Sequence, residues 1–279
     1  MNLTSPSQVK AWCIENGFHP NKVLGQNFLI DQNALKAIVD AGLENVRLFD
    51  CSIVRLKPHV LEIGPGLGVL TEEMLNRGCR VTAIEKDPVL AARLKESLGN
   101  PEGLEVIAGD ALDWLAQSNN RTIEQSNNSF SCMISNLPYQ AGTRILLELV
   151  KARQLKSMTV LVQTEVAERL AAKEGTKTRG LAGVWAQLDY DVRIVRKVSA
   201  SCFWPRPEIG SSVVRLDRHD RNLALSDEER DLFHRLTKQA FEHRRKQLGS
   251  IFKDMIQSTA RAEELSNEDW IEIVKGLIG

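Results

Sequence analysis

From residue 59 onward the sequence alternates short apolar runs with helical patterns, and this alternation limits the possible folds more than any other feature. Runs typical of strands occur at 59–63, 80–85, 104–108, 131–135, 157–163, 190–198 and 211–216. Helical patterns lie between most of them, at 68–77, 88–98, 141–153 and 164–172. Strands joined by helices form a mostly parallel sheet with helices on both faces. We therefore expect an α/β fold built on a seven-stranded sheet.

The last two apolar runs, 190–198 and 211–216, differ from the others because no helix fits between them. The intervening loop holds Pro205 and Pro207, which disfavour regular structure. Two strands joined without a crossover helix pair antiparallel. We therefore expect an antiparallel hairpin at one edge of an otherwise parallel sheet.

The pattern becomes wholly helical after about residue 220. Ser226 and Glu229 have the spacing of a capping box at the start of a long helix. The sequence therefore predicts two domains, an α/β domain over 1–220 and a small all-α domain over 221–279. At the other end, the segment 5–17 has the cap and stop residues of a short helix.

The overall composition excludes several classes of protein. Equal numbers of acidic and basic residues, 36 each, exclude a generally basic nucleic-acid coat, so any contact with RNA must come from a local patch. The five cysteines are scattered and never spaced CxxC, which argues against a disulfide scaffold or a cysteine zinc site and suits a reducing cytoplasm. No run approaches the roughly 20 apolar residues of a membrane span. The polar stretch 117–129 predicts a surface insertion.

A glycine-rich turn, Gly64-Pro65-Gly66-Leu67-Gly68, follows the first strand run and opens a helix. Glycine at such a turn lets the backbone approach a ligand closely. The dinucleotide fingerprint would require glycine at position 69, where the chain has Val69, and Pro65 has no N–H to offer a phosphate. The turn therefore favours a nucleoside-like ligand without phosphates, with a plain tight turn as the alternative.

Two acids follow the next two strands. Glu85 ends its strand 21 residues after Gly64, which is where a ribose presents its hydroxyls in nucleotide-binding folds. Asp110 follows the third strand and could accept a hydrogen bond from an adenine amine. The alternatives are a solvated strand-end acid for Glu85 and a helix N-cap for Asp110.

The segment Asn136-Leu137-Pro138-Tyr139 follows the fourth strand, at the edge where open α/β folds place chemistry. An amide oxygen and a backbone carbonyl can accept the two N–H bonds of a planar amine, and an aromatic face can stack on its base. This combination suits methylation of an amine, in which positioning supplies most of the catalysis. A structural turn with Tyr139 in the core is the alternative.

The segment 232–253 is strongly basic, with six cationic side chains and one acid. Treated as one continuous helix, it places four cations on one face for binding RNA phosphates: Arg235, Lys238, Arg245 and Lys246. Arg244 would project toward the apolar side, so we expect it in an ion pair. The alternative is a solvated face without a ligand. The spacing of His234 and His243 suggests no metal site, and we expect no metal.

With these residues in place, the chain resembles the KsgA/RsmA family of small-subunit ribosomal RNA adenine dimethyltransferases over about residues 19–253. The resemblance is carried by KVLGQNFLID (22–31), EIGPGLGVLT (62–71), IEKDP (84–88), GDAL (109–112), NLPY (136–139), QTEVAERL (163–170), FWPRPEIGSSVVRL (203–216) and AFEHRRKQL (240–248). It implies a class I, Rossmann-like methyltransferase domain with a helical C-terminal domain that binds RNA. Residues 1–58 would form an N-terminal extension whose motif closes over the cofactor.

The resemblance also implies a cofactor, a substrate and site residues. The cofactor would be S-adenosylmethionine, bound by Asn27, Leu29, Gly64, Gly66, Glu85, Asp110 and Asn136. Asn136, Leu137, Pro138 and Tyr139 would form the catalytic segment. The substrate would be two adjacent adenosines near the 3′ end of 16S rRNA, each dimethylated at N6, within the small ribosomal subunit or its precursor. We expect a monomer acting in ribosome biogenesis.

Three other functions stay open at this point. An Erm-type enzyme that methylates a large-subunit adenine shares most of these motifs. A ribosome assembly factor with little catalytic role would need the RNA-binding surface alone. A nicotinamide dehydrogenase is disfavoured because Val69 breaks the fingerprint and no acid suited to hydride transfer is apparent.

Overall fold

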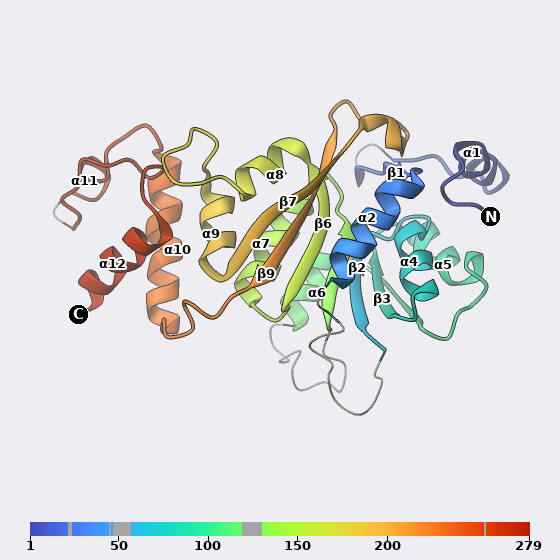
Figure 1. The fold of residues 1–279 in the computed structure, drawn as a ribbon, viewed down its shortest axis with the longest axis horizontal. Coiled ribbons are helices and arrows are strands. Elements are labelled where there is room, and N and C mark those ends of the chain that lie inside the picture. The colour runs from blue at the N-terminus through green and yellow to red at the C-terminus, as the bar shows by residue number, and fades with distance from the viewer. Residues whose placement is uncertain (22–23, 45, 47–56, 119–129, 254) are drawn as a thin grey trace. The chain divides into compact units, whose positions relative to one another are not determined.

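The computed structural model describes residues 1–21, 24–44, 46, 57–118, 130–253 and 255–279. Among these residues a seven-stranded sheet has the order β4-β3-β2-β5-β6-β9-β7 (Figure 1). Its strands are β2 (His59–Ile63), β3 (Arg80–Glu85), β4 (Leu104–Ala108), β5 (Cys132–Asn136), β6 (Ser157–Gln163), β7 (Tyr190–Val198) and β9 (Ser211–Arg218). The predicted α/β fold and its seven strands are therefore confirmed.

Strand directions also agree with the prediction. Strands β4, β3, β2, β5 and β6 pair in parallel along the sheet. Strand β9 pairs antiparallel with β6, and β7 lies beside β9 at the edge. Every residue of β2 is buried, as expected for a parallel strand covered on both faces.

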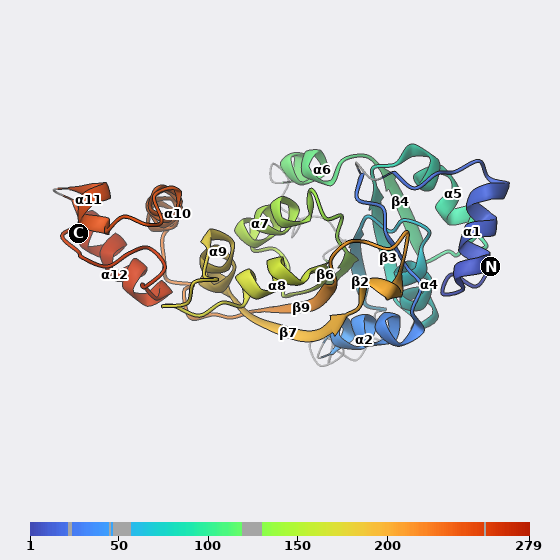
Figure 2. The same cartoon turned by 90° about the horizontal axis from the view of Figure 1, so that it is seen from above.

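Helices cover both faces of this sheet. The helices of this part of the chain are α1 (Pro6–Glu15), which packs in the apolar cluster described below, and α2 (Gln32–Leu43), α4 (Val69–Asn76), α5 (Pro88–Ser97), α6 (Ala111–Ser118), α7 (Gly142–Ala152) and α8 (Thr164–Leu170). Helix α2 contacts α4 and also strands β5 and β6, and α6 contacts α7. Figure 2 shows the pair α2 and α4 on one side of the sheet and the pair α6 and α7 on the other. Within the described ranges, no helix has the length and apolar character that crossing a bilayer requires.

A second, two-stranded sheet joins distant parts of the chain. Strand β1 (Phe28–Leu29) pairs antiparallel with β8 (Phe203–Trp204), so the N-terminal segment is fastened to the loop that follows β7. Ring contacts link Trp12, Phe18, Phe28 and Trp204 in sequence, with centroids 5.9 to 6.5 Å apart. The apolar cluster around these rings holds α1 in place.

The chain divides into two compact units, residues 1–167 with 193–217, and residues 168–192 with 218–279. The second unit contains α9 (Leu181–Asp189), α10 (Asp227–Glu242), α11 (Leu248–Phe252) and α12 (Asn267–Ile278). Helix α10 packs on α9 and α12, and its predicted capping box is present, with Ser226 Oγ accepting from the Glu229 N–H at 3.2 Å. The second unit thus includes residues 168–192 as well as the predicted helical region. The division into two functional domains at residue 220 stays a prediction.

The basic segment 232–253 is not one helix, so the predicted face shared by its four cations is wrong. Helix α10 ends at Glu242, and Arg245 and Lys246 lie in the turn before α11. The chain turns there because Arg244 pairs with Glu263, and the N–H groups of residues 248 and 249 donate to the carbonyls of residues 260 and 258. The ion pair expected for Arg244 is confirmed. All four predicted RNA-binding side chains are exposed.

Two smaller expectations also changed. Helix α1 has Ser5 at its N-cap, but the Ser5 side chain makes no capping bond, and its Oγ lies 3.1 Å from Ser7 Oγ instead. The Gln8 side chain accepts from the Asn2 N–H at 2.7 Å. Residues 119–129 of the predicted insertion lie outside the described residues. Its first two residues, 117 and 118, belong to α6.

Candidate functional site

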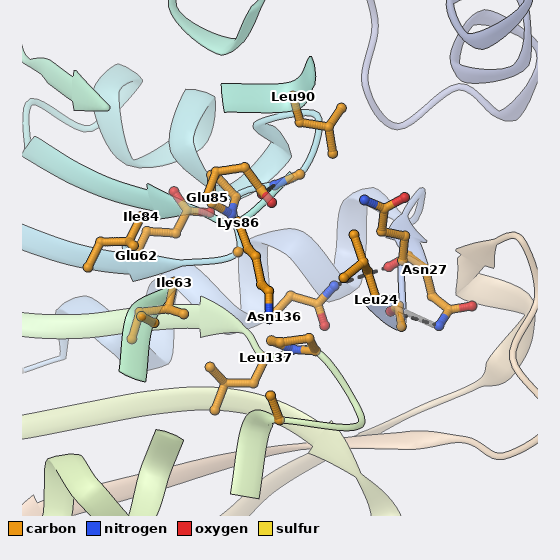
Figure 3. A pocket seen from close by; sticks show the side chains of 18 of the residues that line it. Leu24, Asn27, Glu62, Ile63, Ile84, Glu85, Lys86, Leu90, Asn136 and Leu137 are labelled. Carbon is orange, nitrogen blue, oxygen red and sulfur yellow. Dashed lines mark hydrogen bonds between the residues drawn. The ribbon is translucent and has the colours of Figure 1, made fainter. Parts of the chain in front are cut away.

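A pocket lies at the carboxyl ends of β2, β3, β4 and β5, beside the N-terminal segment (Figure 3). Parallel strands end at the same edge of a sheet, so residues far apart in the sequence meet there. The lining includes all ten residues that the sequence assigned to the cofactor and to catalysis: Asn27, Leu29, Gly64, Gly66, Glu85, Asp110, Asn136, Leu137, Pro138 and Tyr139. Arg235, Lys238, Arg245 and Lys246 are not among the lining residues.

The glycine turn forms one wall of the pocket. Gly64, Gly66 and Gly68 have φ angles of +69°, +60° and +91°, in the left-handed region that favours glycine. At Gly66 there is a steric reason as well, since a Cβ would lie 3.2 Å from the Phe28 ring. The turn thus lets the N-terminal segment approach the backbone closely.

Glu85 lies at the tip of β3 with 6% of its surface exposed. Its carboxylate accepts from the Gly66 N–H at 3.0 Å and from the Asp87 N–H at 2.8 Å. Burial raises the pKa of Glu85, and these backbone hydrogen bonds oppose that rise. Backbone N–H groups fix the orientation of the carboxylate, whose oxygens still have acceptor capacity for a ligand hydroxyl.

Asp110 has two partners at the tip of β4. Its carboxylate accepts from the Leu112 N–H at 2.8 Å and pairs with the Lys86 ammonium at 2.8 Å. The hydrogen bond from Lys86 is the largest of the effects that lower the pKa of Asp110, so this carboxylate is ionised at neutral pH. Asp110 therefore supports the start of α6, as the N-cap alternative expected, while also lining the pocket.

The orientation of Asn136 follows from a single contact. Its Nδ2 donates to the carbonyl of Asn27 at 3.2 Å, drawn as a dashed line in Figure 3. Because a carbonyl can only accept, the nitrogen of the amide faces Asn27 and Oδ1 lies on the other side. Two residues on, the Pro138 carbonyl accepts from the Gly142 N–H at 2.7 Å, which joins the turn to α7.

The N-terminal segment closes one side of the pocket. Gln26 Nε2 donates to Asp87 at 2.8 Å, and Leu29 is buried in β1. A Cβ on Gly25 would lie 3.1 Å from the backbone nitrogen of Tyr139, so this segment runs directly against the turn after β5. Lys22 and Val23, which begin the predicted closing motif, lie outside the described residues.

Comparison with known proteins identifies the family. A sequence profile described as "Ribosomal RNA adenine dimethylase" matches residues 17–275. The chain belongs to the ribosomal RNA adenine dimethylase family. A relative in Deinococcus radiodurans named ribosomal RNA small subunit methyltransferase A is 41% identical over 253 residues, covering 91% of this chain and 79% of the relative. A Chlamydia abortus protein of the same name is 37% identical, with 95% and 90% covered.

Two solved structures share the fold of this chain. A dimethyladenosine transferase from Plasmodium falciparum superposes with a TM-score of 0.70 at 22% identity, covering 90% of this chain and 97% of that one. The 23S rRNA methyltransferase ErmE superposes with a TM-score of 0.62 at 22% identity, covering 91% and 100%. The profile match and the named relatives confirm the family resemblance drawn from the motifs, and the superpositions agree with the predicted fold class.

Glu62 is a pocket-lining residue that was not predicted from the sequence. It is the fourth of the five residues of β2, is 1% exposed and accepts from Thr71 Oγ1 at 2.6 Å. Burial raises the pKa of Glu62 to about 8, helped by the nearby charge of Glu85 and opposed by the Thr71 hydrogen bond. A lone acid inside the apolar run HVLEIG was the available signal, since an acid is rarely fully buried without a reason.

Among the residues for which the structure gives positions, no cluster of three or more His, Cys, Asp or Glu side chains could hold a metal ion. His234 packs edge-to-face on Trp185 and Phe233, with centroids 4.9 and 5.7 Å away.

Proposed function

We propose that this protein transfers methyl groups from S-adenosylmethionine to N6 of two adjacent adenosines near the 3′ end of 16S rRNA, dimethylating each. The observation that carries the proposal is the meeting of Glu85, Asp110 and Asn136 in one pocket of a family member. The names of the relatives, small-subunit methyltransferases, favour 16S rRNA over the large-subunit substrate of an Erm-type enzyme.

The residues present fit S-adenosylmethionine. Glu85 would accept hydrogen bonds from the ribose hydroxyls. Asp110 would accept one from the adenine amine, either replacing its ion pair with Lys86 or in addition to that pair. The Gly64–Gly66 turn, Asn27 and Leu29 would hold the methionine end. The bound cofactor would supply an electrophilic methyl group on a sulfonium.

The turn after β5 would hold the target adenine. Asn136 Oδ1 is one acceptor for the N6 amine, since its Nδ2 is held by Asn27. The Leu137 carbonyl is the second, because the Pro138 carbonyl is already engaged by α7. The ring of Tyr139, half-buried at the pocket, would stack on the base. Fixed acceptors steer the amine toward the methyl group, and the methylated nitrogen can lose its proton to water.

The second unit would provide RNA contacts. Arg235 and Lys238 are exposed on α10, and Arg245 and Lys246 are exposed in the turn beyond it, all free to meet phosphates. We propose that 221–279 is the RNA-binding domain and that the protein acts as a monomer in the cytoplasm, on the small subunit or its precursor.

The test is methyl transfer to purified small and large ribosomal subunits that lack dimethyladenosine, followed by mapping of the modified positions. The proposal expects two adjacent dimethyladenosines in 16S rRNA and none in the large subunit. Modification of the large subunit alone would instead support the Erm-type alternative. Tight binding to small subunits without transfer would support an assembly factor.

A further inference from the structure

The hydroxyl of Tyr139 has a specific partner outside the catalytic segment. Tyr139 Oη and Ser211 Oγ lie 2.7 Å apart and share a hydrogen bond in which either group can donate. Ser211 is fully buried at the start of β9 and does not line the pocket. The bond therefore joins the pocket-lining ring to the protein interior, across 72 residues of sequence.

The backbone around Ser211 is firmly held. Ser211 pairs with Gln163 in the antiparallel β6–β9 ladder. Thr164 directly follows β6 and is the first residue of α8. It donates to the Gly210 carbonyl through its N–H at 3.0 Å and through Oγ1 at 3.1 Å. Since the β6–β9 ladder and Thr164 hold the backbone on either side of it, Ser211 offers Tyr139 a rigid anchor.

We propose that Ser211 is a positioning residue, which sets the orientation of the Tyr139 ring on which the target adenine stacks; this rests on the function proposed above. The phenol hydroxyl acts as a tether and not as an acid or base. A stacked aromatic ring works only at a defined tilt and position, so fixing its far end reduces the freedom lost when the base arrives. Burial raises the pKa of Tyr139, which also keeps the phenol protonated at neutral pH.

The chain provides a matched control for a kinetic test. Ser212 is as buried as Ser211 and adjoins it on the same strand, but its hydroxyl bonds to Thr164. Ser211→Ala should lower kcat for methyl transfer about five- to tenfold, the size of one lost hydrogen bond, and leave the cofactor Kd unchanged. Ser212→Ala should keep wild-type kcat. Tyr139→Phe should lose as much as Ser211→Ala, and the double variant should lose no more than either.

Two kinetic results would overturn the proposal. One is equal kcat for the Ser211→Ala and Ser212→Ala variants. The other is a double variant whose loss is the product of the two single losses, because independent residues behave in that way.

A second readout needs no activity. The sequence holds two tyrosines, Tyr139 and Tyr190, so isotope-labelled tyrosine gives two sets of ring signals, and Tyr190→Phe assigns them. In nuclear magnetic resonance spectra, Ser211→Ala should shift and broaden the Tyr139 signals, whereas Ser212→Ala should leave them in place. Unchanged Tyr139 signals in Ser211→Ala would overturn the positioning role even if 16S rRNA is methylated. Failure of 16S methylation with the expected spectra would count against the proposed function alone.

Discussion

Buried charge is used differently in the two compact units. In the first unit, the acids Glu62 and Glu85 line the pocket with 1% and 6% of their surfaces exposed, and in the described part of the chain neither forms an ion pair. In the second unit, Asp189 and Arg230 are also buried, but they bind each other through two hydrogen bonds of 2.8 and 3.0 Å. Both arrangements place titratable groups out of water, and only the second pairs opposite charges.

The difference separates a site from an architectural contact. Burying a charged carboxylate without a cation costs free energy. Such a group therefore either binds a proton or is stabilised by hydrogen bonds from the protein or from a bound ligand. A buried pair whose opposite charges bind each other holds two helices together and needs no ligand to balance its charge. We therefore expect substitutions in the first unit to change ligand binding and pH dependence, and substitutions at the pair to change folding.

The largest expected effect is at the buried pair. Arg230→Met leaves Asp189 buried without its partner, which should lower the free energy of unfolding by about 3–5 kcal/mol. Urea denaturation followed by circular dichroism measures it, with Arg235→Met on the exposed face of α10 as the control. Stability equal to that of the control would mean that the pair is not structural, and the contrast between the units would fail.

The second effect concerns Glu62. Its pKa in the folded state is raised to about 8, so between pH of about 5 and 8 the folded protein keeps a proton that the unfolded chain releases. Stability from this group must therefore fall as pH rises through that window, by about 1.4 kcal/mol per pH unit. Glu62→Gln should remove this slope.

Urea midpoints at a series of pH values measure the slope, with the exposed Glu96→Gln as the control. Parallel pH profiles for wild type and Glu62→Gln would show that Glu62 is ionised in the folded state.

The third effect is at Glu85. Removing its carboxylate deletes the proposed acceptor of the ribose hydroxyls, so Glu85→Ala should weaken cofactor binding by about 2–3 kcal/mol, or roughly 30- to 150-fold in Kd. Calorimetry with S-adenosylhomocysteine measures this without turnover. An unchanged Kd would place the ribose elsewhere.

The smallest effect is expected on the exposed basic residues. Lys238→Glu with Arg245→Glu should weaken binding to small subunits about tenfold at low salt and reduce the salt dependence of binding. Lys275→Glu, exposed on α12, is the control. Equal affinities for the double variant and the control would mean that these cations are only a solvated face.

The two units also differ in how far the sequence could predict them. The pocket residues follow successive strands, and strand order alone brings Gly64, Glu85, Asp110 and Asn136 to one edge. The prediction for the basic segment 232–253 assumed that the helical period continues to its end. It was wrong because the chain contacts residues 258–263 there, and α10 ends at Glu242. A period carries no information about such long-range contacts.

Other features were missed for the same reason. The β1–β8 pair joins residues 28–29 to 203–204, and the bond from Tyr139 to Ser211 exists only once β9 lies beside β6. Helices α2, α6 and α9 fall between stronger patterns and were not predicted individually. Glu62 is different, because an acid inside an apolar strand was visible in the sequence.

Asn136, oriented by the Asn27 carbonyl, would hold the reacting amine beside the cofactor. The decisive measurement is a methyl-transfer assay of Asn136→Ala on small subunits, with subunit binding measured in parallel. We expect methyl transfer to be lost while the Kd for the subunit stays at the wild-type value. Methylation of 16S rRNA by Asn136→Ala at the wild-type rate would show that this amide does not hold the amine.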